Sequence, residues 1–209
     1  MAVGRDNILA WIGELQQVYA ANKQYLTDLD SAIGDADHGI NMDRGFTAAK
    51  AELEASAPAQ INAILKAVAV ALIRRVGGAA GPLYGTFFMR AATACAGKSE
   101  LEAADVVAMF DAGVQGILQR GKAQLQDKTM VDAWLPALDA MNQSLEAGED
   151  ISTILQKGTA AAEQGMKNTI PLQARKGRAS YLGKRSIGHQ DPGATSTHLM
   201  LRAAAKLWT

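Results

Sequence analysis

Residues 5–26 read RDNILAWIGELQQVYAANKQYL, and apolar side chains recur in this stretch at intervals of three and four residues. The apolar positions are Ile8, Trp11, Ile12, Leu15, Val18 and Tyr19. Because an α-helix has 3.6 residues per turn, this spacing places them on one face of a helix. The stretch therefore predicts an amphipathic helix over residues 5–26.

The rest of the chain continues in the same way, with much alanine and almost no β-branched runs. A polar turn is expected at residues 28–39, and a kink at Pro136. Further helices are predicted at residues 41–55, 61–73, 83–96, 103–120, 128–145, 151–168 and 194–208. Short connections favour antiparallel neighbours, so we expect residues 1–209 to form one all-α domain, an antiparallel eight-helix bundle.

Composition narrows the class of protein. The 209 residues are 48% hydrophobic, and 21 basic residues balance 21 acidic ones. A neutral chain gives no reason to expect nucleic acid or an anionic membrane as a partner. Cys95 is the single cysteine, no 18-residue apolar run occurs, and no signal peptide begins the sequence. These features favour a cytoplasmic protein without disulfides.

The densest polar cluster is DSAIGDADHGIN at residues 30–41. Asp30, Asp35 and Asp37 bring three carboxylates together, and their mutual repulsion is relieved when a hard divalent cation binds. Mg²⁺ typically takes few protein carboxylates and shares its other positions with phosphate oxygens. The alternative is a solvated turn in which aspartate caps a helix.

A second cluster, GGAAGPLYG at residues 77–85, joins two predicted helices. Glycines allow main-chain N–H groups to approach an anion, and the following helix adds its positive N-terminus. The segment lacks the Gly-Lys-Ser/Thr ending of a Walker A loop. A glycine-rich turn without any ligand is the alternative interpretation.

The third cluster lies in residues 173–192, a polar stretch without periodicity. Its basic residues are Arg175, Lys176, Arg178, Lys184 and Arg185. Long unstructured segments are uncommon in compact domains and are often functional, so this one is a candidate phosphate lid. A solvated charged loop is the alternative. Motifs of serine hydrolases and zinc sites do not occur in the sequence.

Several separated motifs follow one another in a specific order. They are the segments 34–42, 77–86, 127–134, 174–183 and 188–194. From about residue 5 to the C-terminus, the chain resembles the nucleotide-binding L domain of dihydroxyacetone kinases. The resemblance implies an antiparallel eight-helix barrel with the nucleotide at one rim. It also implies two Mg²⁺ ions held by Asp30, Asp35 and Asp37.

The resemblance further implies a set of ADP or ATP contacts, which carry over to matching positions. They are His38, Gly39, Ile40, Asn41, Gly78, Ala79, Ala80, Gly121, Thr129, Met130, Arg178, Asp191, Pro192 and Gly193. The implied catalytic residues are the three aspartates and Arg178. Two departures from the family pattern are Ala80, where serine is common, and Gln126, where glycine is usual.

The chain resembles the stand-alone subunit of bacterial kinases driven by the phosphoenolpyruvate phosphotransferase pathway. In that branch, tightly held ADP accepts a phosphoryl group from a phosphohistidine M subunit. The resulting ATP then phosphorylates dihydroxyacetone on a K subunit. The alternatives are a subunit serving another sugar-like substrate, an ADP-loaded regulator that binds a transcription factor, and the N-terminal module of fatty-acid kinases, which occurs fused to further domains.

Overall fold

A computed structural model describes residues 2–209, and the elements within them are almost entirely helical. The α-helices are α1 (Arg5–Ala21), α2 (Lys23–Ile33), α3 (His38–Ser56), α4 (Ile61–Arg75), α5 (Ala80–Ala94), α6 (Ala103–Gly121), α7 (Val131–Glu146), α8 (Ile151–Asn168) and α9 (Pro192–Leu207). Arg178–Ser186 form a 3₁₀ segment, η1. Two short strands, β1 (Val3–Gly4) and β2 (Glu100–Leu101), pair antiparallel.

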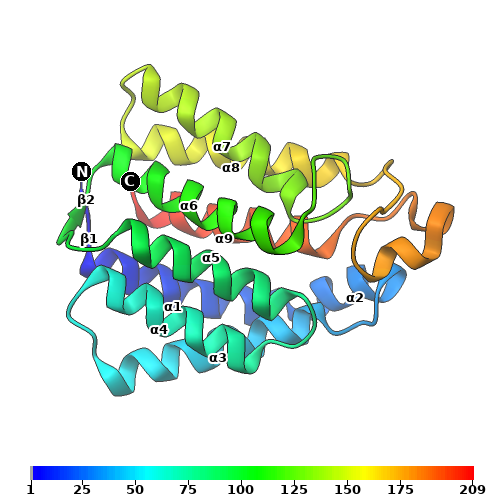
Figure 1. The fold of residues 1–209 in the computed structure, drawn as a ribbon, viewed down its shortest axis with the longest axis horizontal. Helices are drawn as coiled ribbons and strands as arrows, with labels where there is room; N and C mark the ends of the chain where they lie inside the picture. The colour runs from blue at the N-terminus through cyan, green and yellow to red at the C-terminus, as the bar shows by residue number, and fades with distance from the viewer. Residues whose placement is uncertain (1) are drawn as a thin grey trace.

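Eight of the helices form a closed ring. Each of α3 to α8 packs against the next helix in the chain, and α1 closes the ring by packing against both α3 and α9. Successive helices of the ring run in opposite directions, and both chain ends lie at the same end as β1 and β2 (Figure 1). The predicted all-α antiparallel fold is therefore confirmed, and the ring contains the predicted number of helices.

The helix α2 lies outside the ring and was not predicted as a separate helix. Its residues had been divided between the predicted helix at 5–26 and the predicted turn at 28–39. The predicted single helix over residues 5–26 is wrong, because α1 ends at Ala21. The next residue, Asn22, caps this end, and its side-chain amide donates to the Val18 carbonyl oxygen at 2.8 Å. The new helix then continues to Ile33, so the predicted turn at 28–39 shrinks to residues 34–37. Leu26 and Ile33 are buried, and these two apolar positions hold α2 against the ring.

Other boundaries shift by a few residues. The helix α5 begins at Ala80 rather than at residue 83, and α7 begins at Val131 rather than at residue 128. The later start of α7 follows from left-handed backbone angles, with φ of 72° at Gln126 and 61° at Lys128. The helix α7 continues through Pro136 as one element. The long polar stretch, for which no regular structure was predicted, contains the 3₁₀ segment η1.

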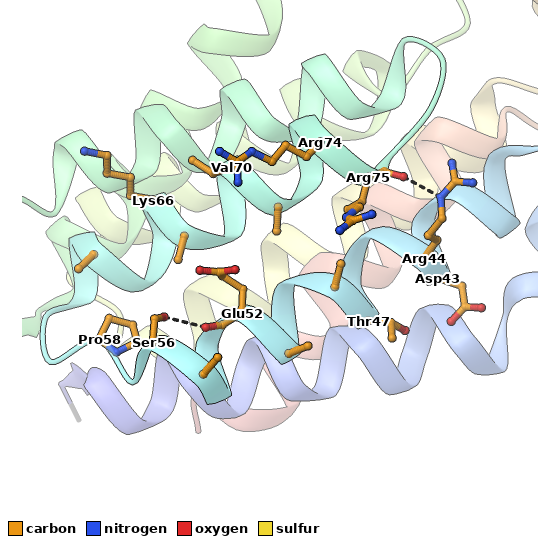
Figure 2. A pocket seen from close by; sticks show the side chains of 16 residues that line it. Asp43, Arg44, Thr47, Glu52, Ser56, Pro58, Lys66, Val70, Arg74 and Arg75 are labelled. Atoms are coloured by element: carbon orange, nitrogen blue, oxygen red, sulfur yellow. Dashed lines mark hydrogen bonds between the residues drawn. The ribbon is translucent and has the colours of Figure 1, made fainter.

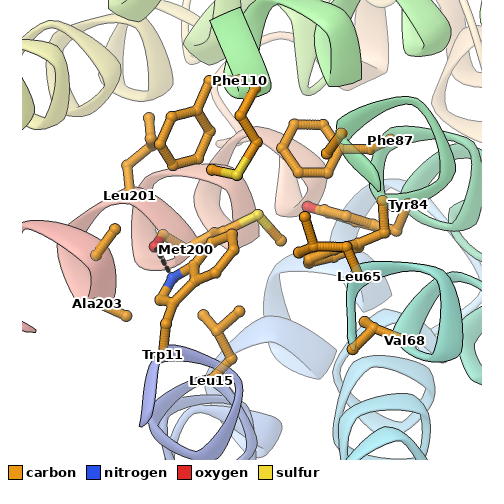
Figure 3. Packing of buried hydrophobic residues seen from close by; sticks show 14 of the residues in the cluster. Trp11, Leu15, Leu65, Val68, Tyr84, Phe87, Phe110, Met200, Leu201 and Ala203 are labelled. Atoms are coloured by element: carbon orange, nitrogen blue, oxygen red, sulfur yellow. Dashed lines mark hydrogen bonds between the residues drawn. The ribbon is translucent and has the colours of Figure 1, made fainter. Parts of the chain in front are cut away.

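Aromatic side chains fill the centre of the ring (Figure 3). The ring centroid of Trp11 on α1 lies 5.7 Å from that of Phe88 on α5 and 5.2 Å from that of Trp208 at the C-terminus. The Trp11 indole N–H donates to the Met200 carbonyl oxygen on α9 at 3.3 Å. This core joins the first and last helices, so the two ends of the sequence close the ring. Within residues 2–209, no helix is long and apolar enough to cross a membrane.

Candidate functional site

The alternating direction of the helices brings four helix N-termini to one rim of the ring. The helices α3, α5, α7 and α9 all begin at this rim, and the connections before them are residues 34–37, 76–79, 122–130 and 169–191. Figure 1 shows these connections together at the end opposite to β1 and β2. A helix N-terminus carries unpaired N–H groups and a partial positive charge. The rim is therefore suited to a polyanion.

Three carboxylates meet at this rim. Asp30 lies near the end of α2, Asp35 in the connection, and Asp37 at the N-cap of α3. One ligand oxygen from each lies within 4.8 Å of the others. Oxygen-only donors at this separation fit a hard divalent cation, since Mg²⁺ and Ca²⁺ prefer carboxylates. The geometry of these three residues fits the predicted Mg²⁺ centre. That the cation is Mg²⁺, and that two ions bind, stay predictions.

Local hydrogen bonds hold the cluster in shape. The Oδ2 atom of Asp30 accepts from the main-chain N–H of Asp37 at 2.9 Å and of His38 at 3.1 Å. These bonds fix one oxygen of Asp30 on the N-terminus of α3. A Cβ atom at Gly34 would approach Asp30 Oδ1 to 2.0 Å, so the tight turn requires glycine there. The sequence order Asp-x₄-Asp-x-Asp thus folds into one cluster.

A cavity of about 550 Å³ extends from the carboxylates across the rim. Most of the predicted site residues line it: Asp30, Asp35, Asp37, His38, Gly78, Ala79, Ala80, Gly121, Thr129, Met130, Arg178, Asp191, Pro192 and Gly193. The lining includes the three aspartates and also residues of the first turn of α5. A nucleotide needs this combination, with cation ligands and main-chain N–H groups near its phosphates.

Three predicted contacts do not line the cavity. Gly39 packs under α2, where a Cβ atom would lie 2.0 Å from the Lys23 carbonyl oxygen, and Ile40 is exposed. Asn41 is buried, and its Oδ1 accepts from the Arg44 guanidinium at 2.5 Å. Arg44 also donates to the carbonyl oxygen of Arg75 at 2.7 Å, at the end of α4. Asn41 therefore supports the glycine loop from behind.

The lid loop reaches the carboxylates through one arginine. The Nε atom of Arg178 lies 3.0 Å from Asp35 Oδ2. Lys176 and Arg178 line the cavity, whereas Arg175, Lys184 and Arg185 lie outside it. Tyr181 on the lid is 87% exposed, although it borders the cavity. Only part of the basic run therefore faces the candidate site.

The sequence analysis missed several residues of the cavity. Leu83 and Ile117 form an apolar wall, and Arg120 adds a cation that no motif had indicated. Lys128 lies within the motif at residues 127–134, but no role was predicted for it. Its side chain is almost completely buried. No apolar pattern surrounds Lys128 in the sequence, so its burial could not be predicted from the sequence alone.

His38 is held from below by a buried hydroxyl network. Its Nε2 atom lies 2.9 Å from Ser196 Oγ, and the Tyr84 hydroxyl lies 2.7 Å from the same oxygen. Burial lowers the pKa of His38 and raises the pKa of Tyr84 to about 12. At neutral pH both groups are therefore uncharged. The hydroxyl groups of Ser196 and Tyr84 thus orient the His38 imidazole without adding charge to the rim.

A larger groove of about 930 Å³ lies elsewhere, along the outer faces of α3 and α4 (Figure 2). Alanines form its floor, and its polar rim includes Glu52, Lys66 and Arg74, all of them exposed. No predicted site residue lines this groove. Because its charged groups extend into solvent and do not converge, we assign the candidate site to the smaller cavity.

The chain is similar to proteins of known function. The DAK2 domain family matches residues 32–206. The chain is 45% identical over 205 residues to the ADP-binding subunit of the PEP-dependent dihydroxyacetone kinase of Escherichia coli (strain K12), covering 98% of each chain. A corresponding ADP-binding subunit from Listeria innocua is 40% identical over 203 residues, covering 97% of this chain and 96% of that one.

A solved structure has the same fold. The dihydroxyacetone kinase of C. freundii, in complex with AMP-PNP and Mg²⁺, superposes with a TM-score of 0.77 at 20% identity. The match covers 99% of this chain and 34% of that one, so this chain spans about a third of the larger kinase. The likeness supports the helical fold.

Proposed function

The chain belongs to the DAK2 domain family, and from this premise we propose that it is the ADP-binding subunit of a phosphoenolpyruvate-dependent dihydroxyacetone kinase. The observation that carries the proposal is the position of the three carboxylates. One carboxylate oxygen from each of Asp30, Asp35 and Asp37 lies within 4.8 Å of the others. The three residues border the same cavity as the N-terminus of α5 and Arg178. The predicted phosphate, cation and lid residues thus border one space.

In this proposal, each residue has a defined task. The three aspartates hold two Mg²⁺ ions, which when bound neutralise phosphate charge and orient the transferred group. The N–H groups at Gly78, Ala79 and Ala80 bind phosphate oxygens from the first turn of α5. Ala80 has no hydroxyl, so it acts through its main chain alone. Thr129 and Met130 contact the base, and Asp191, Pro192 and Gly193 border the nucleotide at the start of α9.

The proposed reaction has two phosphoryl transfers. First, a β-phosphate oxygen of ADP attacks the phosphorus of phosphohistidine on an M subunit; the P–N bond breaks and ATP forms. Second, a hydroxyl of dihydroxyacetone on a K subunit attacks the γ-phosphorus, loses its proton and releases ADP. Arg178 stabilises the charge that develops on the transferred group. No nucleophile of this chain takes part, so it contributes positioning and electrostatics.

The experiment analyses the protein as purified. We expect mass spectrometry of the denatured protein to detect ADP, and metal analysis to detect Mg²⁺. Chelation should release the nucleotide and lower the melting temperature, because a ligand that binds the folded state stabilises it. Addition of K and M subunits and phosphoenolpyruvate should then yield dihydroxyacetone phosphate. Failure to bind ADP with Mg²⁺ present would contradict the proposal.

A pull-down from native lysate distinguishes the alternatives. K and M subunits support the proposed kinase, whereas a different kinase subunit indicates another sugar-like substrate. A transcription factor as the main partner would favour the regulator. Reconstituted turnover with each candidate partner then decides between them.

A further inference from the structure

Lys128 is a buried cation whose role is not explained by the motifs. The residue is 1% exposed, and it adopts a left-handed backbone conformation with φ of 61°. A buried ammonium loses its hydration, which is costly unless other groups replace it. Burial accordingly lowers the pKa of Lys128, while Asp191 and Asp132 act in the opposite direction. Burial of the ammonium therefore requires hydrogen-bond acceptors around Nζ.

The Nζ atom of Lys128 is surrounded by main-chain carbonyl oxygens from two distant segments. The oxygens of Thr169 and Ile170 lie at 2.8 and 3.4 Å, at the C-terminal end of α8. That of Leu172 lies at 3.1 Å, and that of His189 at 2.5 Å. A cation at a helix C-terminus complements the carbonyls that have no partner there. One ammonium thus binds the end of α8 and also a second segment.

These carbonyls mark both ends of the lid. Residues 173–188, which make up most of the lid, lie between these carbonyls in the sequence, so Lys128 contacts the chain just before and just after them. Main-chain bonds support the same junction. Gly188 N–H donates to the Ile170 oxygen at 2.8 Å, and Arg175 N–H donates to the Asp127 oxygen at 3.0 Å. The base of the lid is therefore closed around one charged group.

Lys128 also belongs to the loop that lines the nucleotide cavity. Lys128 and its neighbours Thr129 and Met130 border that cavity, as does Arg178 on the lid. A single side chain thus connects the loop beneath the proposed nucleotide with the lid beside it. Loss of the ammonium would leave several carbonyls without a donor and release both ends of the lid together.

We propose that Lys128 is the positioning residue that anchors the lid over the nucleotide site and so limits nucleotide release. The inference rests on the proposed function, because it concerns how long the site retains ADP. The anchor acts through hydrogen bonds from Nζ to main-chain carbonyl oxygens of the segments that flank the lid. It therefore affects the rate of dissociation more than the chemistry of transfer.

The test compares release of a fluorescent ADP analogue from the full-length protein and its variants, with Mg²⁺ present. Lys128→Met keeps the length of the side chain but has no donor, and we expect release to be at least about tenfold faster, as for a lost charge-assisted bond. Lys128→Gln retains two donors, so its effect should be smaller. Leu101→Ala is the matched control, because it opens the core at β2, at the far end of the ring, and should lower stability without faster release.

Hydrogen exchange supplies a second readout that a general loss of stability does not mimic. In Lys128→Met, the amides of Arg175, Gly188 and Asp191 should exchange faster, while those of α5 and α6 stay unchanged. Unchanged release from the folded Lys128→Met variant would overturn the inference, as would equally fast release from Leu101→Ala.

If neither lysine variant folds, hydrogen exchange of the wild-type protein tests the inference. Its three junction amides should exchange together and more slowly than amides within Arg178–Ser186; equal exchange would overturn the inference. If the wild-type protein binds no ADP, the proposed function fails. Hydrogen exchange of the wild type and of Lys128→Met needs no bound nucleotide, so it then still shows whether Lys128 anchors the lid.

Discussion

Arg178 on the lid lies with its Nε atom 3.0 Å from Oδ2 of Asp35, so the lid and the carboxylate cluster are in direct contact. The side chains are 66% and 36% exposed, respectively. Exposed ion pairs contribute about 0–1 kcal/mol to stability, because solvent screens them. The contact therefore matters for the site more than for the fold.

The first prediction concerns the carboxylates. Asp35→Asn or Asp37→Asn removes one negative ligand with little change of volume, so Mg²⁺-dependent phosphoryl transfer should fall by roughly a hundredfold or more. Helical content by circular dichroism should stay unchanged. Asp28→Asn is the matched control, since Asp28 is an exposed carboxylate on the same helix as Asp30 and accepts from Gln24. Global unfolding of the first two variants would instead indicate a structural role.

The second prediction concerns the lid arginine. Arg178→Ala should reduce turnover about ten- to a hundredfold, because a charge-assisted contact is worth roughly 1.5–3 kcal/mol. The melting temperature should change little, given the exposure of the ion pair. Arg185→Ala tests the same charge change at a lid position outside the cavity and should retain turnover. Partner affinity is measured in parallel, so that a loss of binding to the K subunit is distinguished from a loss of phosphoryl transfer. Normal turnover of Arg178→Ala would make this loop a solvated surface segment.

The sequence predicted the fold well because the apolar pattern of the ring is regular. Ile151–Asn168 was predicted to the residue, since Asp150 caps the helix and its apolar face is continuous. The boundary between α1 and α2 at Asn22 was missed, because the apolar pattern continues across it. The Asn22 side chain caps α1 through a hydrogen bond that the sequence does not reveal. In the site, the motifs identified residues that line one cavity. Leu83, Ile117 and Arg120 were not found, because their position depends on how helices pack.

The third prediction concerns Gln126, which the structure holds in a backbone conformation that favours glycine. Its φ of 72° is left-handed, a conformation that costs a residue with a Cβ atom about 1 kcal/mol and glycine almost nothing. Gln126→Gly should therefore raise the free energy of unfolding by up to about 1 kcal/mol, less the entropy that glycine adds to the unfolded chain. Urea denaturation measures the change. Gln124→Gly, at an exposed residue of the same loop without positive φ, should be destabilising.

The fourth prediction concerns pH and Asp191, whose carboxylate accepts from Ala194 N–H at 2.7 Å at the start of α9. Burial raises the pKa of Asp191 to about 7. In the unfolded chain the same carboxyl has a pKa of about 3.9. The folded protein thus binds the proton more tightly. The stabilising contribution of this group is complete below about pH 4 and is lost as the pH rises towards 7.

Asp191→Asn tests this dependence, because the amide oxygen can still cap α9 and no charge forms at any pH. Relative to wild type, the free energy of unfolding of the variant should increase between about pH 4 and 7, by up to about 4 kcal/mol, and then level off. Urea denaturation of nucleotide-free protein in chelator, across this pH range, measures it. Asp139→Asn, at an exposed position on α7, controls for the loss of one negative charge. Parallel pH profiles for Asp191→Asn and wild type would show that the Asp191 carboxyl titrates normally in the folded protein.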